Sequence, residues 1–448
     1  MILRIYKRLQ QELERLPSIQ GYMTNRRHPS FYFDRVRRVL DLLGNPERGF
    51  RYVHIGGTSG KGSTTMLIHS MLRAAGKRVG SNLSPHVTTL VERIMINGRP
   101  VSPTDLWWAW TQMQPALRKV RTLGKDYLPS YFEALVVMSF LLFKKYRVEW
   151  VVLEVGCGGE FDATNVIPPP DVAVITSIGL DHTNILGRTR KLIARTKAGI
   201  IKHGSYVITG EGDAAIRRIL CARAQRMRTP CLYVPLPSWR HKTFQGKTIF
   251  RMPNGKTIST PLIGEHQIHN MALAMAVARH IKLPLSAVIR GIRATKLPAR
   301  TEYIQSSPDV IIDGAHNPDK IKALVRVIRN IPHKRLHAIV GIGHAKPARQ
   351  IIRELGKITD AFTFTQAPID QPAPEPAGSL LRIAKKLFPS KPMRMVKNPK
   401  RAVRSVMKEN PRDTLIVVTG SLYLAGAVRE LWFPEERILT TRSLFPRT

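Results

Sequence analysis

A glycine-rich loop between a short apolar segment and a helical segment constrains the fold of this chain more than any other feature. The segment RYVHIG (51–56) is typical of a buried strand, and Lys61 to Gly76 has the pattern of a helix that ends at a glycine. The loop between them, GGTSGKGST (56–64), gathers backbone N–H groups at the positive end of the helix dipole. The sequence therefore predicts a strand, an anion-binding loop and a helix, which together form one unit of an α/β sheet.

The spacing in this loop departs from the common phosphate-binding pattern G-x-x-x-x-G-K-[ST]. Ile55 stands where the first glycine belongs, and Gly62 follows the lysine. Lys61 would still supply a positive charge for the β- and γ-phosphates, and Ser63 or Thr64 a hydroxyl near the phosphates or Mg²⁺. A glycine turn that binds no ligand is the alternative interpretation. The strand before the loop and the helix after it favour phosphate binding.

Strand and helix patterns alternate along the rest of the chain. We expect further strands at 148–155, 171–178, 205–209, 309–313, 336–341 and 414–418, and a helix at 267–280. Alternation of this kind indicates a parallel α/β sheet that is covered on both faces. The pattern restarts near Leu297, so we expect a first domain over residues 1–296 and a smaller Rossmann-like α/β domain over residues 297–448.

The composition is that of a globular chain with more than one domain. Of its 448 residues, 43% are hydrophobic and 23% are charged. The longest strongly apolar run, 134–143, is far shorter than the roughly 20 residues of a spanning helix. The N-terminus has no signal-peptide core, and the three cysteines form no C-x-x-C pair, which argues against a disulfide scaffold or a cysteine zinc site. We therefore expect a soluble, cytoplasmic protein in a reducing compartment, with no membrane partner.

The chain is strongly basic, with 71 Lys and Arg against 31 Asp and Glu, a net charge of +40. Such a charge favours anionic partners, among them nucleic acid. The densest basic stretch, Ala377 to Lys408, holds ten Lys or Arg and no acidic residue, but Phe388 is its one aromatic residue. Nucleic-acid surfaces usually combine basic with stacking residues. We therefore expect a generally basic surface and no specific nucleic-acid partner.

Four further motifs carry polar side chains at predicted strand ends or before an apolar segment. Glu154 in LEVGCGGEFDATN (153–165) is well placed for a Mg²⁺ that bridges nucleotide phosphates. The other three motifs contain Asp181 and His182 in SIGLDHTNILG (177–187), Lys197 in TKAGIIK (196–202), and Asp313 and His316 in IIDGAHNP (311–318). Taken singly, each has an ordinary interpretation as a solvated carboxylate, a hydrogen-bonded histidine, a helix lysine or a turn.

Together and in this order, the five motifs resemble the folylpolyglutamate synthase/dihydrofolate synthase branch of the Mur ligase family. The combination of GTSGKGS, LSPH, LEVG-x-GG-x-x-DATN and DGAHNP is typical of the folate branch rather than the cell-wall branch. The resemblance covers nearly the whole chain and includes FYFDRVRRVLDLLGNP (31–46), SNLSPHV (81–87), SYFEALVV (130–137), GEHQIHNMALA (264–274) and VTGSLYLAGAV (418–428). It implies a Mur-ligase-like fold: an ATP-binding central domain with an N-terminal folate-loop segment, followed by a glutamate-ligase domain.

The resemblance also implies a role for each matching residue. Lys61, Lys197 and His316 would be catalytic, and Lys197 would carry a carbamate on its ε-amine. ATP would contact Ser59, Gly60, Lys61, Gly62, Ser63, Asn270, Arg300 and Asp313; Mg²⁺ would be bound by Ser84, Glu154 and His182; and the pterin side would be lined by Ser30, Phe31, Tyr32, Ser130, Tyr131, Phe132, Glu133, Phe161, Asp162 and Ala163.

The chain departs from the family pattern at several of these motifs. Thr196 stands where a glutamate commonly precedes K-A-G-I, and Ala299 replaces the glycine of L-P-G-R. Cys157 and Glu160-Phe161 replace an aliphatic residue and Arg-Leu on the pterin side. The segment GIGHAKP (341–347) stands where a loop with Asp-Lys-Asp is usual.

The activity implied by the resemblance is ATP-dependent ligation of L-glutamate to a folate through an acyl phosphate, in folate biosynthesis and one-carbon metabolism. Dihydropteroate is a second candidate acceptor, ATP and Mg²⁺ are the expected cofactors, and a monomer is the expected state. One alternative is a ligase of the same architecture with another carboxylate acceptor, such as a cell-wall precursor. A more distant alternative is a P-loop ATPase that binds nucleic acid and has lost ligase activity.

Overall fold

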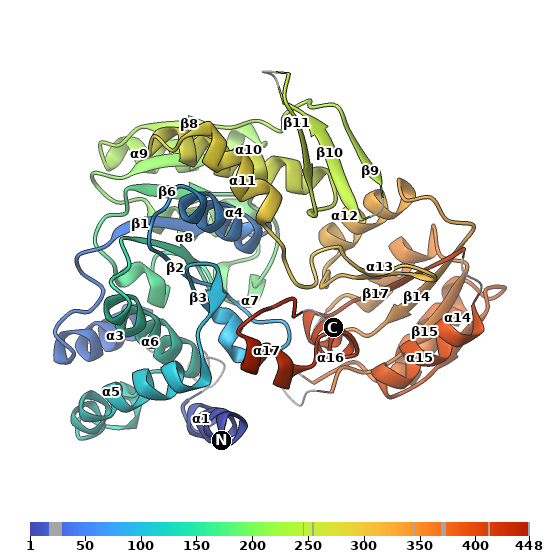
Figure 1. Cartoon of the computed structure of the whole chain (residues 1–448), viewed down its shortest axis with the longest axis horizontal. Coiled ribbons are helices and arrows are strands. Elements are labelled where there is room, and N and C mark those ends of the chain that lie inside the picture. Colours follow the sequence, from blue (N-terminus) through green and yellow to red (C-terminus); the bar gives the residue numbers. More distant parts are fainter. Residues whose placement is uncertain are drawn as a thin grey trace.

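Two large sheets, each covered by helices, lie side by side in the computed structural model of this chain (Figure 1). The structure describes residues 1–17, 29–244, 246–252, 255–344, 346–368, 373–410 and 413–446. The first sheet ends at Tyr233 and the second begins at Glu302. The change of sheet thus brackets Leu297, and the division into domains 1–296 and 297–448 stays a prediction.

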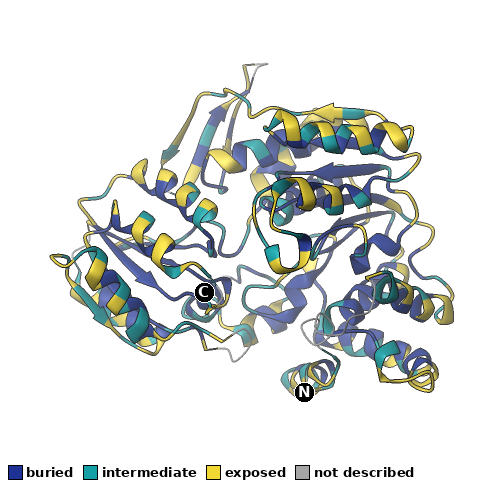
Figure 2. Ribbon diagram, turned by 180° about the vertical axis from the view of Figure 1, so that it is seen from behind, coloured by how far each residue is buried: buried dark blue, intermediate teal, exposed yellow. Residues whose placement is uncertain are grey.

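The first sheet has eight strands in the order β4-β3-β2-β5-β1-β6-β7-β8. All neighbours from β2 to β8 are parallel, and β3 and β4 add an antiparallel edge. The expected strands are confirmed as β1, β5, β6 and β7, whose apolar residues are buried on both faces (Figure 2). The bounds are β1 Arg51–Gly56, β2 Val79–Asn82, β3 Ile94–Ile96, β4 Arg99–Pro100, β5 Trp150–Glu154, β6 Val172–Ile175, β7 Tyr206–Thr209 and β8 Cys231–Tyr233.

Helices cover both faces of this sheet. The helices α4 (Lys61–Ala74), α10 (Glu265–His280) and α11 (Leu285–Ala294) bury one face, with Val53 and Ile55 of β1 in the shared core. The helices α6 (Tyr131–Lys145), α8 (Arg190–Lys197) and α9 (Ala214–Arg226) bury the other face. The helices expected after the glycine loop and over 267–280 are confirmed as α4 and α10.

A helical lobe packs beside α6. It consists of α1 (Ile2–Glu14), α3 (Ser30–Leu42) and α5 (Pro103–Arg121), and its core also contains Ile438 and Leu439 from α17 (Glu435–Thr441). The last helix of the chain therefore returns to pack near the first (Figure 1).

The second sheet has six strands in the order β12-β13-β17-β14-β15-β16, all parallel except β12. The strands expected at 309–313, 336–341 and 414–418 are confirmed as β13, β14 and β17. The strand bounds are β12 Glu302–Gln305, β13 Asp309–Ile312, β14 Arg335–Val340, β15 Ala361–Phe364, β16 Met393–Met395 and β17 Thr414–Thr419. The helix bounds are α12 Pro318–Arg329, α13 Ala348–Gly356 and α14 Ala377–Leu387 on one face, and α15 Pro399–Glu409 and α16 Leu422–Arg429 on the other.

A small antiparallel sheet, which the sequence reading did not anticipate, stands between the two large sheets at the upper edge of Figure 1. Its strands are β9 (His241–Phe244), β10 (Lys247–Arg251) and β11 (Thr257–Thr260). Alternate residues of β10 and β11 are buried, so one face packs on the core below α11 and the other faces solvent.

The cysteine expectation needs a correction. Cys221 in α9 and Cys231 in β8 form a disulfide, and Cys157 is the free cysteine. The absence of C-x-x-C spacing excluded a dense disulfide scaffold, but it said nothing about two cysteines that a helix and the following strand bring together. The argument against a disulfide scaffold therefore did not anticipate this single pair.

The remaining elements are short. They are α7 Thr183–Leu186 and the 3₁₀ turns η1 Leu90–Arg93, η2 Lys125–Tyr127, η3 Ala163–Val166 and η4 Ala198–Ile200. Within the described ranges, none of the helices combines the length and the apolar character that a membrane crossing requires.

Candidate active site between the two sheets

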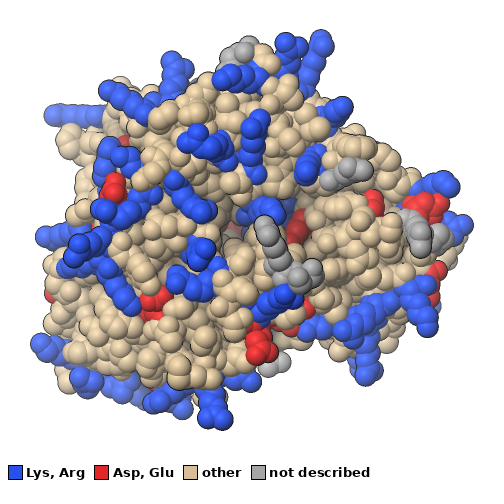
Figure 3. Space-filling view, viewed as in Figure 1, with Lys and Arg blue, Asp and Glu red and all other residues tan. Residues whose placement is uncertain are grey.

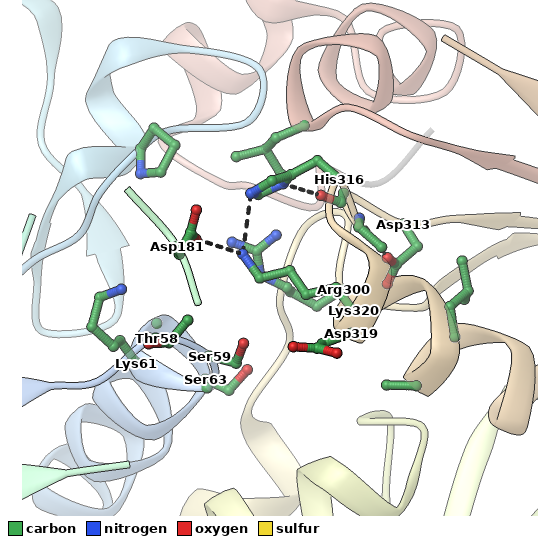
Figure 4. Close-up of a pocket in the computed structure, with 18 of the residues that line it drawn as sticks. Thr58, Ser59, Lys61, Ser63, Asp181, Arg300, Asp313, His316, Asp319 and Lys320 are labelled. Carbon is green, nitrogen blue, oxygen red and sulfur yellow. Dashed lines mark hydrogen bonds and ion pairs between the residues drawn. The ribbon is translucent and has the colours of Figure 1, made fainter. Parts of the chain in front are cut away.

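The carboxyl ends of parallel strands from both large sheets face one cavity of about 560 Å³ (Figure 4). The loops after β1, β5 and β6 reach it from the first sheet, and those after β13, β14 and β17 reach it from the second. Loops and helix N-termini converge at this end of a parallel sheet, which makes it the usual place for a ligand. The predicted glycine loop and the DGAHNP motif, which lie far apart in the sequence, therefore line the same cavity.

The glycine loop forms one wall of the cavity, as the sequence predicts. Residues 59–63 line the cavity, and the hydroxyl of Thr176 at the end of β6 donates to the carbonyl of Ser59 over 2.6 Å. Gly60 has a φ of 86°, and a Cβ at this residue would collide with the side-chain oxygen of Asn270. The close approach of Asn270 explains why a glycine is needed in the loop at this point.

All three of the expected Mg²⁺ ligands also line the cavity: Ser84, Glu154 and His182. The backbone N–H of Ser84 donates to Oε2 of Glu154 over 3.0 Å, so the two residues are adjacent. Burial raises the pKa of Glu154, and the charge of Lys61 opposes that shift. Burial lowers the pKa of His182 against the opposing charge of Asp181, which favours the neutral imidazole that can bind a metal.

The donor set suits Mg²⁺ together with a nucleotide. The described part of the chain contains no group of three His, Cys, Asp or Glu side chains placed to hold a metal. Mg²⁺ commonly takes one or two carboxylates and completes its shell with phosphate oxygens and water. Glu154 and the Ser84 hydroxyl fit this pattern. Glu154 also lies beside the glycine loop that would bind the phosphates, since a Cβ placed on Gly62 would lie 3.3 Å from Oε2 of Glu154.

Lys197 lies behind the glycine loop and does not line the cavity. It is the last residue of α8, it is 5% exposed, and its Nζ donates to the carbonyl of Gly57 over 2.9 Å. Burial, and to a smaller extent the charge of Lys61, lower the pKa of Lys197 to about 8. Burial, the larger cause, becomes visible only in the fold.

The second sheet supplies the opposite wall. Asp313 follows β13 and accepts hydrogen bonds from the backbone N–H groups of Thr301 and Ala315, both over 2.7 Å. Its carboxylate therefore fixes the two segments that carry Arg300 and His316, the other two residues expected on this wall.

His316 is held in one tautomer by its neighbours. Its Nδ1 donates to the carbonyl of Gly314 over 2.8 Å, since a carbonyl can only accept, and its Nε2 accepts from Nζ of Lys320 over 3.1 Å. Burial, and to a smaller extent the charge of Lys320, lower the pKa of His316 to about 3. At neutral pH the ring is thus neutral and orients Lys320.

A cluster of three charged residues crosses the cavity and was not expected as a unit. Asp181, from the loop after β6, lies 3.9 Å from Nζ of Lys320 in α12 and 3.7 Å from Nζ of Lys346 in the loop after β14 (Figure 4 shows Asp181 and Lys320). Burial alone would raise the pKa of Asp181, but Lys320, His182 and Lys346 bring it down to about 2. Burial lowers the pKa of Lys320 to about 8 against the opposing charge of Asp181.

Sequence reasoning singled out Asp181 but missed Lys320 and Lys346. One signal for Lys320 was present, because Asn317-Pro318 is a typical helix start and places Lys320 in the first turn, one turn after His316. Lys346 lies in GIGHAKP, where the chain departs from the family pattern, and no local feature marked it.

The residues expected on the pterin side lie in the helical lobe and in the segments beside it, outside the lining of the cavity. Ser30 to Tyr32 begin α3, Ser130 to Glu133 begin α6, and Phe161 to Ala163 lead into η3. Ser130 and Glu133 form the capping box of α6, and Glu133 also accepts from Arg35 over 2.7 Å in a buried ion pair.

Phe132 in α6, beside this lobe, contacts the wall of the cavity. Its ring packs so closely on Gly156, a residue of the cavity wall, that a Cβ there would lie 2.5 Å from the ring. The expected ATP and Mg²⁺ residues are thus brought together in one cavity, and the pterin-side residues adjoin it through Phe132.

Comparison with known proteins gives a consistent family. Residues 104–278 match the model of the Mur ligase middle domain, and residues 299–422 match that of the Mur ligase glutamate ligase domain. The chain is 32% identical to the folylpolyglutamate synthase of Lacticaseibacillus casei, over 88% of this chain and 93% of the relative. It is 31% identical to the dihydrofolate synthase/folylpolyglutamate synthase of Bacillus subtilis, over 88% of this chain and 94% of the relative.

A solved structure agrees over the whole architecture. The Mycobacterium tuberculosis folylpolyglutamate synthase complexed with ADP superposes with a TM-score of 0.86 and 29% identity, over 96% of this chain and 99% of that chain. The agreement covers both large sheets.

Proposed function

The chain belongs to the Mur ligase family, in the group of the folylpolyglutamate synthases, and we propose that it uses ATP to join L-glutamate to a folate. The observation that carries this proposal is the single cavity in which the glycine loop of one sheet faces the lysine cluster of the other. Dihydropteroate is proposed as a second acceptor, since the Bacillus subtilis relative carries both synthase names.

The reaction needs ATP because a carboxylate has no good leaving group for attack by an amine. An oxygen of the folate carboxylate would attack the γ-phosphorus of ATP, giving an acyl phosphate and ADP. The glutamate amine would then attack the acyl carbon, the bond between that carbon and the phosphate oxygen would break, and the nitrogen would lose a proton. Amide, ADP and phosphate are the products.

The first wall would bind ATP and stabilise the transfer. Lys61 and the N-terminus of α4 place positive charge where negative charge moves between the phosphates. Asn270 on this side and Arg300 on the opposite wall would complete the nucleotide contacts, and Asp313 would hold Arg300 in place through the backbone. Ser84, Glu154 and His182 would hold Mg²⁺, which would neutralise phosphate charge.

Lys197 is proposed to carry a carbamate. Its pKa of about 8 leaves roughly a tenth of the amine neutral at pH 7, and only the neutral amine can attack CO₂, forming an N–C bond with loss of a proton. The carbamate would turn a buried cation beside the phosphates into an anion with two oxygens. Thr196, which replaces the usual glutamate, directs its hydroxyl to the carbonyl of Leu192 and gives that carbamate no carboxylate neighbour.

The second wall is proposed to bind L-glutamate. Lys320 and Lys346 present positive charge to the cavity, and His316 orients Lys320. Carboxylates of glutamate would compete with Asp181 for these lysines. The folate would then approach from the helical lobe, past Phe132, with its carboxylate between the two walls and its ring near the starts of α3 and α6.

The remaining parts of the proposal concern the setting of the enzyme. We propose a monomer, because residues of one chain form both walls of the cavity. A cytoplasmic location is also proposed, where ATP and L-glutamate are both available.

The proposal is tested by measuring phosphate release from ATP with each substrate omitted in turn. Release should require both L-glutamate and a tetrahydrofolate or dihydropteroate acceptor. Release that is unchanged without either substrate would contradict the ligase assignment, and release with a cell-wall precursor in place of the folate would assign the other acceptor class.

A further inference from the structure

The outer face of the small sheet β9–β11 carries side chains that have no role in the proposed ligase reaction. Directly opposite residues in antiparallel strands project on the same side, and the register pairs Phe244 with Lys247 and Lys242 with Ile249. Arg251, two residues further along β10, projects on this side as well. None of these five residues lines the cavity between the large sheets.

This outer face is open and cationic. Lys242, Lys247 and Arg251 are exposed, and Phe244 is 58% exposed, the highest value of any phenylalanine in the described chain. The described residues place no carboxylate within ion-pair distance of these three cations. The opposite face is closed, because Phe250 is buried there and stacks on Trp239 with ring centroids 5.2 Å apart.

The surrounding sequence also contains basic residues without acidic ones. The 51 residues from Ala214 to Gly264 contain ten Lys or Arg and no Asp or Glu. In Figure 3, Lys and Arg side chains project from the upper edge of the molecule, where Figure 1 shows this sheet. Unlike the stretch from Ala377 to Lys408, this one combines basic residues with an exposed aromatic ring.

We propose that the outer face of β9–β11 binds single-stranded nucleic acid. Lysines and an arginine on an open sheet would contact the phosphates, and Phe244 offers a flat ring on which an unpaired base can stack. A stacking ring among cations that form no ion pair with a described carboxylate favours a nucleobase polymer over an acidic peptide, which has no bases to stack. The sequence-based expectation of no nucleic-acid partner considered residues 377–408 alone.

The test uses fluorescence anisotropy of a labelled 12-nucleotide oligo(U) with the full chain. The double variant Lys242→Gln/Lys247→Gln should lower affinity by about tenfold and flatten the salt dependence by about one unit per lysine removed. The variant Phe244→Ala should lower affinity for the single strand by about tenfold and leave the affinity for an RNA duplex unchanged.

A matched control separates this face from net charge. The variant Lys385→Gln/Lys386→Gln removes two exposed lysines from α14, so both double variants carry the same total charge. The control should bind oligo(U) like the unaltered chain, and glutamate-dependent phosphate release should be the same in all variants, which shows that each has folded.

Three results with oligo(U) would overturn the proposal. They are no binding of oligo(U) at low salt, an equal loss in the control variant, and full single-strand affinity in Phe244→Ala. Pelleting with vesicles of anionic lipid tests the other polyanionic surface: if Lys242→Gln/Lys247→Gln loses vesicle binding and keeps oligo(U) binding, the face contacts membranes and the proposal is wrong.

Discussion

The two walls of the cavity are built in different ways. The first wall is one continuous loop, residues 59–63, in which backbone N–H groups, the N-terminus of α4 and Lys61 follow each other directly. The second wall is assembled from separate segments: Lys320 comes from α12 and Lys346 from the loop after β14. Both lysines lie close to Asp181, which lies in the loop after β6 of the first sheet.

This difference means that the two walls depend in different ways on how the two sheets are placed. The glycine loop would bind phosphates even if the second sheet moved away, because residues 59–63 form one continuous segment. The second wall depends on the placement of both sheets, because its lysines meet a carboxylate of the other half of the chain. We therefore expect damage to the first wall to stop phosphoryl transfer, and damage to the second wall to weaken glutamate binding.

The largest effect is expected for Lys61→Ala, which removes the side-chain charge of the first wall. Phosphate release with saturating substrates should fall about a thousandfold or more, because this charge acts where the phosphoryl group moves. Circular dichroism and the melting temperature should stay close to those of the unaltered chain, since Lys61 is not part of a core cluster. Activity within about tenfold of the unaltered chain would show that the loop has another role.

Variants of Lys197 test whether a negative charge is needed behind the first wall. Lys197→Ala and Lys197→Arg should lose at least about a hundredfold in activity, whereas Lys197→Glu should retain more, because it alone keeps the negative sign. In the unaltered chain, activation by bicarbonate should grow as the pH rises through the lysine pKa of about 8, since the neutral amine increases in that direction.

Intact-mass analysis and ¹³C NMR with labelled bicarbonate give a readout that does not depend on turnover. A carbamate signal should be present in the unaltered chain and absent in Lys197→Arg. An arginine variant as active as the unaltered chain would refute the carbamate.

These two lysines also show how far the sequence reaches. The glycine loop, Glu154 and Asp313 were predictable because each follows a strand whose apolar run is legible, and the α/β class follows from the same runs. Lys197 was noted in the segment TKAGIIK, but its catalytic role came from the resemblance. Its burial, the largest cause of its lowered pKa, depends on the packing of α8 behind Gly57.

Other parts of the site and of the fold could not be predicted, because no short stretch of sequence marks them. Lys346 reaches Asp181 only because the two sheets face each other, and a sequence does not state how two sheets are placed. The strands β9–β11 are short, and their one open face was visible only from the alternation of burial. The Cys221–Cys231 pair likewise depends on the tertiary approach of α9 and β8.

The second wall is tested by Lys320→Ala. The KM for L-glutamate should rise by about ten- to a hundredfold, as expected for loss of a charge-assisted hydrogen bond, while the KM for ATP should change by less than about twofold. Lys322→Ala on the same helix is the control, because Lys322 is exposed and does not line the cavity. A larger change in the KM for ATP than in the KM for glutamate would contradict this assignment and indicate that the second wall binds ATP.

The smallest effect is expected at the helix cap that positions Lys320. The side chain of Asn317 accepts from the backbone N–H of Lys320 over 2.9 Å, and Asn398 caps α15 in the same way over 2.9 Å, away from the cavity. Each Asn→Ala change should cost about 1 kcal/mol of stability, and only Asn317→Ala should raise the KM for glutamate, by a few fold. Equal kinetic effects of both variants would mean that global stability, and not the position of Lys320, sets the glutamate constant.

The central claim is that the cavity couples ATP cleavage to glutamate addition through an acyl phosphate. The most direct test is a single reaction with a folate whose carboxylate oxygens are ¹⁸O, followed by mass spectrometry of the released phosphate. Because the carboxylate oxygen that attacks the γ-phosphorus stays with the phosphate when the amide forms, one ¹⁸O atom should appear in each phosphate released. Phosphate without label, formed together with glutamylated folate, would contradict the account.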